Sequence, residues 1–227
     1  MYWKIVVFLS LFSLLSCSKD HDTTDNTQQS STLYFPPDGT GIWESVTPQS
    51  LGWNTASIPD LEKLLQDNGT RAFILLKDGK IVLEKYYGKN LTGLAAFSQT
   101  ALWYWASAGK TLTSFTVGMA QEDEFLSIQD KSSKYLGTGW TSLPIQQEAQ
   151  ITVLHQLTMT TGLDDGVPQS HGISPGDLIY KAVPGTRWAY HNGPYTLLEK
   201  VVANATGMTF ETYFKSKLTD KIGMDGS

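Results

Sequence analysis

The chain reads SAGKTLTSFTVGMA over residues 107–120. Leu112, Phe115 and Met119 recur in this stretch at the spacing that places apolar side chains on one face of a helix. We therefore predict an amphipathic helix that starts with this stretch, carries its apolar face on these three residues, and ends before Phe125.

The first turn of the predicted helix contains the pattern S-x-x-K, which places Ser107 and Lys110 one turn apart on the same face. A serine hydroxyl is a weak nucleophile until a neighbouring base accepts its proton, and a lysine in a suitable environment is such a base. The N–H groups at the start of a helix also point to where an oxyanion would form. The leader contains another S-x-x-K at residues 16–19, so the pattern alone fits either a catalytic pair or a solvated lysine.

Outward from this helix, the sequence predicts a hairpin and further helices. Residues 72–77 and 80–86 are rich in aliphatic residues and flank Asp78-Gly79, a two-residue turn that tolerates positive φ and joins adjacent antiparallel strands. Helices are predicted over residues 57–68, 151–158 and 195–205, the last ending at Gly207. The predicted order is helix, hairpin and then mostly helices.

A second candidate for chemistry is Tyr190-His191-Asn192, which lies in a predicted loop before the 195–205 helix. A phenol close to a lysine ammonium ionises more easily, so Tyr190 is suited to relay a proton between Ser107 and a leaving group. The Asn192 amide is able to donate to a substrate carbonyl and to accept from a lysine. The alternative interpretation is a turn with an incidental aromatic residue.

Taken together, four segments in this order resemble the serine β-lactamase and penicillin-binding-protein superfamily. The resemblance is to the branch with a tyrosine in its second box, which includes class C β-lactamases, family VIII esterases, D-aminopeptidase and carboxypeptidase relatives and 6-aminohexanoate-dimer hydrolases. The matching segments are the stretch from Ser107, residues 126–136 (LSIQDKSSKYL), residues 151–163 (ITVLHQLTMTTGL), and residues 184–192 (PGTRWAYHN) with the helix after them.

The resemblance implies an α+β fold of the β-lactamase/transpeptidase-like type, with an antiparallel sheet flanked by helices and a mostly helical lobe. It also implies roles for the residues that match the motifs. Ser107 would be the acylated nucleophile, Lys110 its proton acceptor, Tyr190 the second general acid/base and Asn192 the amide that orients the substrate.

The resemblance also predicts a feature that this sequence lacks. The family has a third box, K-T-G, H-x-G or a variant, on a strand nearer the C-terminus, which supplies the second N–H of the oxyanion hole. No such strand follows Tyr190, because His191-Asn192-Gly193 belongs to the second box. The expectation is therefore an N-terminal part of a longer hydrolase, without the C-terminal strands of the sheet.

The N-terminal residues read as a targeting device. Residues 1–17 contain one cation and an apolar run too short to span a bilayer comfortably, and they end in Cys17 after Leu-Leu-Ser, which looks like a lipobox. Residues 18–32 are polar and are expected to form a flexible tether, and residues 33–227 the hydrolase domain. This layout predicts an exported bacterial lipoprotein anchored through Cys17 at a periplasm-facing membrane or the cell surface; an ordinary signal peptide is the alternative.

The composition excludes several other classes of function. Seventeen Lys and Arg residues against 22 Asp and Glu residues make the formal net charge −5, so a nucleic-acid partner is not expected. One cysteine and four histidines in 227 residues do not fit a disulfide framework or a multi-thiolate metal site. Neither a cofactor nor a metal is expected.

The leading hypothesis is a serine hydrolase that cleaves an ester or amide in a small-molecule substrate through an acyl-enzyme on Ser107. A β-lactamase or D,D-peptidase is an alternative with the same chemistry. A catalytically silent binding or scaffold domain is the alternative from another class, because the third box is absent.

Overall fold

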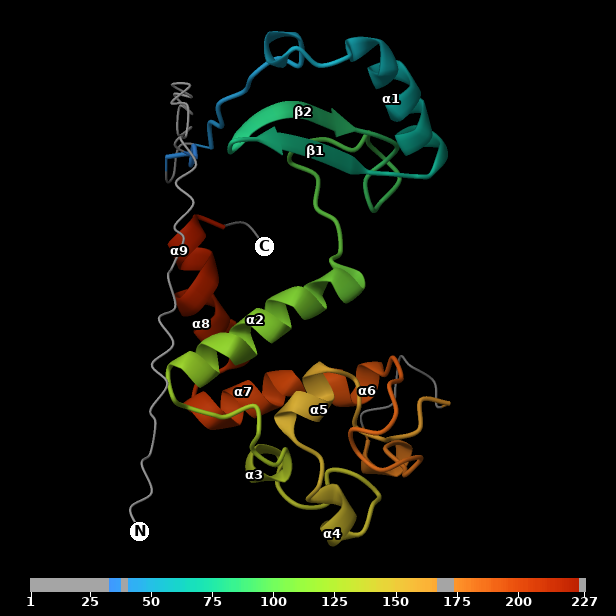
Figure 1. Ribbon diagram of the computed structural model, residues 1–227, viewed down its shortest axis with the longest axis vertical. Coiled ribbons are helices and arrows are strands. Elements are labelled where there is room, and N and C mark those ends of the chain that lie inside the picture. The colour runs from blue at the N-terminus through green and yellow to red at the C-terminus, as the bar shows by residue number, and fades with distance from the viewer. Residues whose placement is uncertain (1–32, 38–40, 167–173, 225–227) are drawn as a thin grey trace, which may run out of the picture.

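The computed structural model describes residues 33–37, 41–166 and 174–224. The predictions for residues 1–17, the tether 18–32 and the lipidation of Cys17 lie outside these ranges. In the described residues a hairpin unit and a mostly helical part are joined by an irregular segment, residues 87–105 (Figure 1). The α+β class is confirmed at this level.

The elements follow the predicted order. They are η1 (Gln49–Leu51), η2 (Thr55–Ser57), α1 (Ile58–Asp67), β1 (Ala72–Lys77), β2 (Lys80–Tyr86), η3 (Ala106–Ala108), α2 (Gly109–Glu122), α3 (Ser133–Leu136), α4 (Ile145–Glu148), α5 (Val153–Leu157), η4 (Pro175–Asp177), α6 (Asn192–Thr196), α7 (Leu198–Thr206), α8 (Phe210–Phe214), a single π-helical turn η5 (Lys215–Thr219) and α9 (Asp220–Ile222). Within the described ranges, every helix is too short or too polar to span a lipid bilayer.

The hairpin has the predicted bounds. β1 and β2 pair antiparallel around Asp78 and Gly79, whose φ values of 51° and 85° fit a turn that needs two residues in the left-handed region. A Cβ at Gly79 would lie 2.0 Å from the carbonyl oxygen of Tyr34, so only glycine fits there. Leu75 pairs with Leu83 and Leu76 with Ile81, so Val82 is an extra residue that bulges β2.

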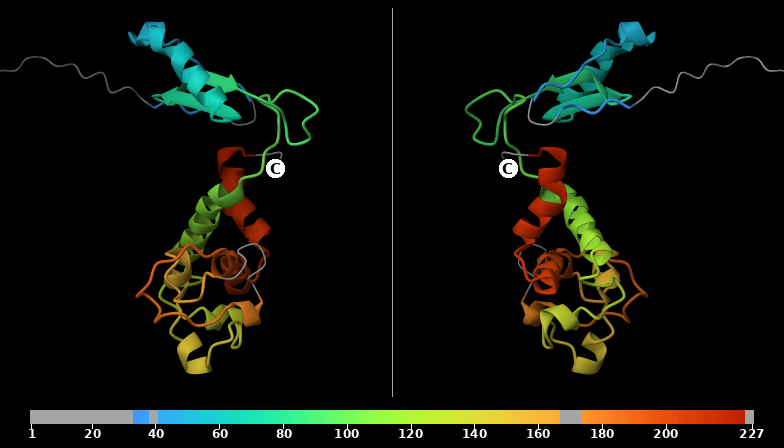
Figure 2. Two further views of the ribbon diagram at one scale, coloured as in Figure 1. Left: turned by 90° about the vertical axis from the view of Figure 1, so that its right-hand side faces the viewer. Right: turned by 90° about the vertical axis from the view of Figure 1, so that its left-hand side faces the viewer.

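The prediction for α1 needs one correction. Ser57 occupies the N-cap position, but its side chain does not cap the helix; its hydroxyl accepts from the Asn54 amide instead. The helix lies along the hairpin in Figures 1 and 2 and is tied to β2 by an ion pair between Glu62 and Lys85, 2.8 Å apart.

The helix α2 is present, but its fully buried face differs from the predicted stripe, of which Leu112 and Met119 are half-buried. Phe115 is 41% exposed. The buried residues are Thr113, Thr116, Val117 and Ala120. A threonine can be buried on this face because its hydroxyl finds a partner on its own helix. The Thr116 hydroxyl donates to the Leu112 carbonyl at 2.7 Å. The small residues on this face let α7 pack closely against α2.

The helical part has one main core, in which α7 packs against α2, α3 and α8. In Figure 2, α2 and the segment from α8 to α9 both run from this part toward the hairpin. The fully enclosed aliphatic residues Val117, Val153, Leu198, Val201 and Val202 have no measurable exposure. Burial of these apolar side chains stabilises the packing of the helices around this core.

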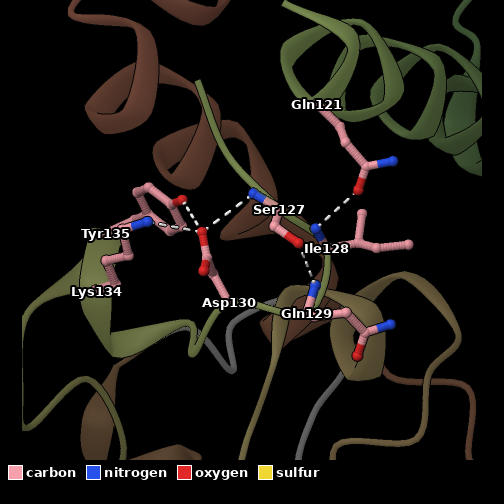
Figure 3. A network of polar contacts seen from close by, with 7 residues as sticks. All are labelled: Gln121, Ser127, Ile128, Gln129, Asp130, Lys134 and Tyr135. Carbon is pink, nitrogen blue, oxygen red and sulfur yellow. Dashed lines mark hydrogen bonds and ion pairs between the residues drawn. The ribbon is translucent and has the colours of Figure 1, made fainter. Parts of the chain in front are cut away.

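A carboxylate organises the chain between α2 and α3 (Figure 3). Asp130 Oδ2 accepts from Ser127 N at 3.1 Å, from Lys134 Nζ at 2.8 Å and from the Tyr135 hydroxyl. The hydrogen bonds from Lys134, Tyr135 and Ser127, in that order, lower the pKa of Asp130 to about 2. The turn is therefore held by a carboxylate that stays ionised down to low pH.

The predicted 195–205 helix starts earlier and is interrupted. Helix α6 begins at Asn192, and α7 follows after Leu197. At this junction the hydrogen bond from Leu197 N to the Gly193 carbonyl is long, at 3.4 Å. Gly193-Pro194 resembles loop sequence, but a proline in the first turn of a helix loses no intrahelical hydrogen bond. The predicted stop is confirmed, since Gly207 caps α7 with a φ of 71°.

Candidate active site

The first half of the site is the turn that enters α2. Ser107 lies in η3 and Lys110 in the first turn of α2, and Lys110 Nζ donates to Ser107 Oγ at 3.3 Å. The residue before the serine, Ala106, has a φ of 45°. A non-glycine residue in this region is strained, so the turn that presents Ser107 is maintained at a cost in stability.

The second half of the site comes from a loop more than eighty residues away. The Tyr190 hydroxyl lies 2.5 Å from Ser107 Oγ, a short hydrogen bond between residues 83 positions apart. Two contacts fix the loop just before Tyr190: Ala189 N donates to the Met159 carbonyl at 3.0 Å, and Arg187 Nη2 donates to Asp165 Oδ1 at 2.6 Å. The structure thus brings the two predicted motifs together.

The contacts of Tyr190 change its acidity. The hydrogen bond from the Ser107 hydroxyl and then that from Lys110 lower the pKa of the Tyr190 phenol. Burial opposes them, and the charge of the Lys110 ammonium adds a smaller lowering effect. The Tyr190 side chain is 39% exposed, so a substrate carbonyl is able to reach it. Ser107 therefore faces a proton acceptor that ionises more readily than an ordinary tyrosine.

Asn192 is placed by the start of a helix. It is the first residue of α6, two positions after Tyr190, and it is half-buried. Gln156 supports helix α6, because its Nε2 donates to the Pro194 carbonyl at 2.6 Å. The substrate-orienting role of Asn192 stays a prediction.

His191, between the two motif residues, is 2% exposed. Burial lowers its pKa, while the nearby carboxylates of Asp165 and Asp164 oppose that effect and Arg187 adds to it. The imidazole is therefore neutral at pH 7.

A pocket of about 330 Å³ adjoins the turn that carries Ser107. It is lined by Trp105, Ala106, Gly109, Lys110, Leu112, Thr113, Tyr195, Thr196, Glu199, Phe210 and Phe214. Its size is at the lower end of the range for small-molecule sites. Trp105 itself is 54% exposed beside the nucleophile.

Two residues important for the site geometry were not predicted from the sequence. Gln156 is buried in α5 and Tyr195 is buried in α6, and both support the loop or helix that carries a motif residue. Tyr195 stands three residues after Asn192, one helical turn away, and that spacing was the available signal. Within the described ranges, no three His, Cys, Asp or Glu side chains gather as a metal site would require.

The family model described as Beta-lactamase matches residues 58–227. Penicillin-binding protein 4* of Bacillus subtilis (strain 168) is 25% identical over 177 residues, which are 70% of this chain and 37% of that protein. The chain thus spans less than two fifths of the length of the curated relatives it matches.

Solved structures agree on the fold. The structure of FmtA from Staphylococcus aureus superposes with a TM-score of 0.57 at 20% identity, covering 79% of this chain and 51% of that chain. A class C β-lactamase gives the same TM-score and identity, covering 74% of this chain and 48% of that chain. The β-lactamase/transpeptidase-like fold expected from the sequence is confirmed.

Proposed function

The chain belongs to the Beta-lactamase family, and from this premise we propose that it is a serine hydrolase that cleaves an ester or amide bond through an acyl-enzyme on Ser107. The observation that carries the proposal is the meeting of three side chains: Ser107 Oγ lies 2.5 Å from the Tyr190 hydroxyl and 3.3 Å from Lys110 Nζ. A nucleophile within hydrogen-bond reach of its base is the signature of covalent catalysis.

The distances suggest a division of labour between the two partners of Ser107. The shorter contact is to Tyr190, and the hydrogen bonds from Ser107 and Lys110 lower the pKa of its phenol. We therefore assign proton acceptance to Tyr190, with Lys110 supplying the positive charge that stabilises the phenolate. This order differs from the one implied by the resemblance, in which Lys110 accepts the proton first.

In the proposed reaction, the Ser107 proton moves to Tyr190 while Oγ forms a bond to the substrate carbonyl carbon. Tyr190 then returns the proton to the leaving alcohol or amine as its bond to that carbon breaks. A water molecule loses a proton to Tyr190 in the same way, attacks the acyl carbon and releases the acid, and Ser107 regains the proton.

A β-lactam or a D,D-peptide is the second candidate substrate. The observation in its favour is the relative named penicillin-binding protein 4*. The same serine, lysine and tyrosine serve either substrate, so the two candidates differ in specificity and not in mechanism.

The test is covalent labelling of the full chain by a fluorophosphonate and by a fluorescent penicillin, with Ser107→Ala as the control. Ser107 is exposed, so the alanine variant is expected to fold normally. Labelling by the phosphonate alone supports an esterase or amidase, and labelling by both supports the β-lactamase or peptidase. Labelling by neither supports a silent scaffold and refutes the proposal, as does an acyl adduct that persists in Ser107→Ala.

We further propose that the protein is a lipoprotein anchored in a membrane through Cys17. The support is the lipobox pattern that ends at the single cysteine of the chain. Radiolabelled palmitate is expected to enter the wild-type protein and not a Cys17→Ser variant. Equal incorporation in both, or none in either, would indicate an ordinary signal peptide.

A further inference from the structure

A second tyrosine, in addition to Tyr190, contacts Lys110. Tyr195 lies in α6, is 6% exposed and packs in the core with Val117 and Leu198. Its hydroxyl donates to the backbone carbonyl of Lys110 at 2.9 Å. This bond ties the first turn of α2 to the helix that begins at Asn192, although the two are 85 residues apart in sequence at the point of contact.

The ring of Tyr195 also contacts the lysine side chain. Lys110 Nζ lies 5.6 Å from the centroid of the Tyr195 ring and 5.2 Å from that of the Tyr190 ring. Both distances are within the range in which an ammonium is attracted to an aromatic face. The ammonium therefore contacts the faces of two rings, that of the exposed Tyr190 and that of the buried Tyr195.

The two tyrosines have opposite environments. Burial raises the pKa of Tyr195, a hydrogen bond with Ser114 opposes it, and the neighbouring Tyr190 raises it, whereas the contacts with Ser107 and Lys110 lower the pKa of Tyr190. When the pKa values of two neighbouring groups shift in opposite directions, the two groups take different roles. Tyr195 stays a neutral donor to the Lys110 carbonyl over the pH range in which Tyr190 ionises.

We propose that Tyr195 is a positioning residue that holds Lys110 against Tyr190, through its hydroxyl on the lysine backbone and its ring face on the ammonium. The chemical consequence of this placement rests on the proposed function, in which the Tyr190 phenolate accepts the Ser107 proton. Without the ring face, the ammonium spends less time beside Tyr190, and the phenolate loses part of its stabilisation.

The groups that face the Tyr190 phenol include Ser107 from η3, Lys110 from α2 and Tyr195 from α6. Glu199 of α7 lines the adjoining pocket together with Lys110 and Tyr195. Lys110 supplies the positive charge among them. A change confined to the Tyr195 ring therefore reaches the ionisation of Tyr190 through Lys110.

The experiment measures Tyr190 ionisation directly, in the full chain and without turnover. Tyrosines are labelled with carbon-13 at Cζ, the Tyr190 signal is assigned by its loss in Tyr190→Phe, and its pH titration is followed by NMR. Two variants are compared: Tyr195→Phe, which keeps the ring face and loses the hydroxyl, and Tyr195→pentafluorophenylalanine, which keeps the shape and removes the attraction for a cation.

The Tyr190 titration midpoint is expected to rise by about half a pKa unit in the pentafluoro variant relative to Tyr195→Phe. The matched control places the same pair of substitutions at Tyr213, another buried tyrosine, whose ring lies 5.7 Å from Lys217 Nζ instead. There the Tyr190 midpoint should not move. Equal midpoints in the two Tyr195 variants, or a lower one in the pentafluoro variant, would overturn the proposal.

A second measurement separates this inference from the proposed function. The rate of Ser107 labelling by a fluorophosphonate is followed against pH in the same variants, and its titration is expected to shift with the NMR midpoint. An NMR shift in a chain that labels at no pH would support the placement of Lys110 and refute the hydrolase. Normal labelling with unmoved NMR and kinetic midpoints would leave the hydrolase standing and refute the role of Tyr195.

Discussion

Gln156 offers the sharpest test of how the site is supported. Its side chain is 1% exposed; Oε1 accepts from the Ser132 hydroxyl at 2.7 Å and Nε2 donates to the Pro194 carbonyl at 2.6 Å. Gln156→Leu keeps the volume and removes both bonds, which leaves a buried hydroxyl and a buried carbonyl without these partners. Each such group costs about 1–3 kcal/mol, and the added apolar contact offsets part of the sum.

We therefore expect Gln156→Leu to lower the free energy of unfolding by about 2–4 kcal/mol, or the Tm by roughly 5–15 °C. Labelling of Ser107 should slow about tenfold, because α6 shifts when Pro194 is released and small misplacements are costly in catalysis. Thermal and denaturant unfolding measure the first effect and probe labelling the second. Gln147→Leu, the same change at an exposed position of α4, is the control and should stay within about 0.5 kcal/mol of wild type.

The double variant Ser132→Ala with Gln156→Leu completes the argument. Because it removes both partners of one bond, it should be more stable than the sum of the single effects predicts. Strict additivity, or a Gln156→Leu protein as stable as wild type, would show that these contacts do not support α6.

The remaining predictions concern the proton path, the acidic turn and the strained residue before the nucleophile. Lys110→Ala and Tyr190→Phe should each lower the acylation rate about 10²-fold or more, with effects that do not add, and wild-type kinetics in Tyr190→Phe would contradict the proposed path. Asp130→Asn should lower stability at pH 7 by about 1 kcal/mol. Because folding depresses the pKa of Asp130 from 3.8 to about 2, the stability difference between wild type and variant is present above pH 4 and should vanish as the pH falls from about 4 to about 2. Urea unfolding over pH 2–7 measures this difference, and a difference that stays constant over that range would refute the prediction. Ala106→Gly should raise the unfolding free energy by about 0.5–1 kcal/mol, since glycine adopts the φ of 45° without strain, and a loss of stability in thermal unfolding would argue against that strain.

Local features of this protein were predictable because their causes lie within a few residues. Asp78-Gly79 determines the hairpin turn, and the aliphatic runs on both sides determine the strands, so the bounds of β1 and β2 followed directly. Gly207 ends α7 for an equally local reason. The family resemblance was also readable, since it rests on the order of short motifs along the chain.

The buried face of α2 was not predictable in the same way. Helical periodicity favoured the large apolar side chains, yet Phe115 is exposed and Thr116 is fully buried. What decides the buried face is the shape of the partner helix and the ability of a threonine to bond to its own backbone. Neither property appears in the hydrophobic pattern of α2 alone.

By itself, the sequence determined which residues were candidates for chemistry: Ser107, Lys110, Tyr190 and Asn192. Only the tertiary structure decided that Ser107 and Tyr190 lie 2.5 Å apart, that Tyr190 is nearer to the serine than Lys110 is, and that the Tyr195 hydroxyl donates to the Lys110 carbonyl. The physical reason is that a contact across 83 residues depends on the packing of every element between them. The motifs show which side chains are present and in what order along the chain. The distances between these side chains depend on how α2, α5 and α6 pack.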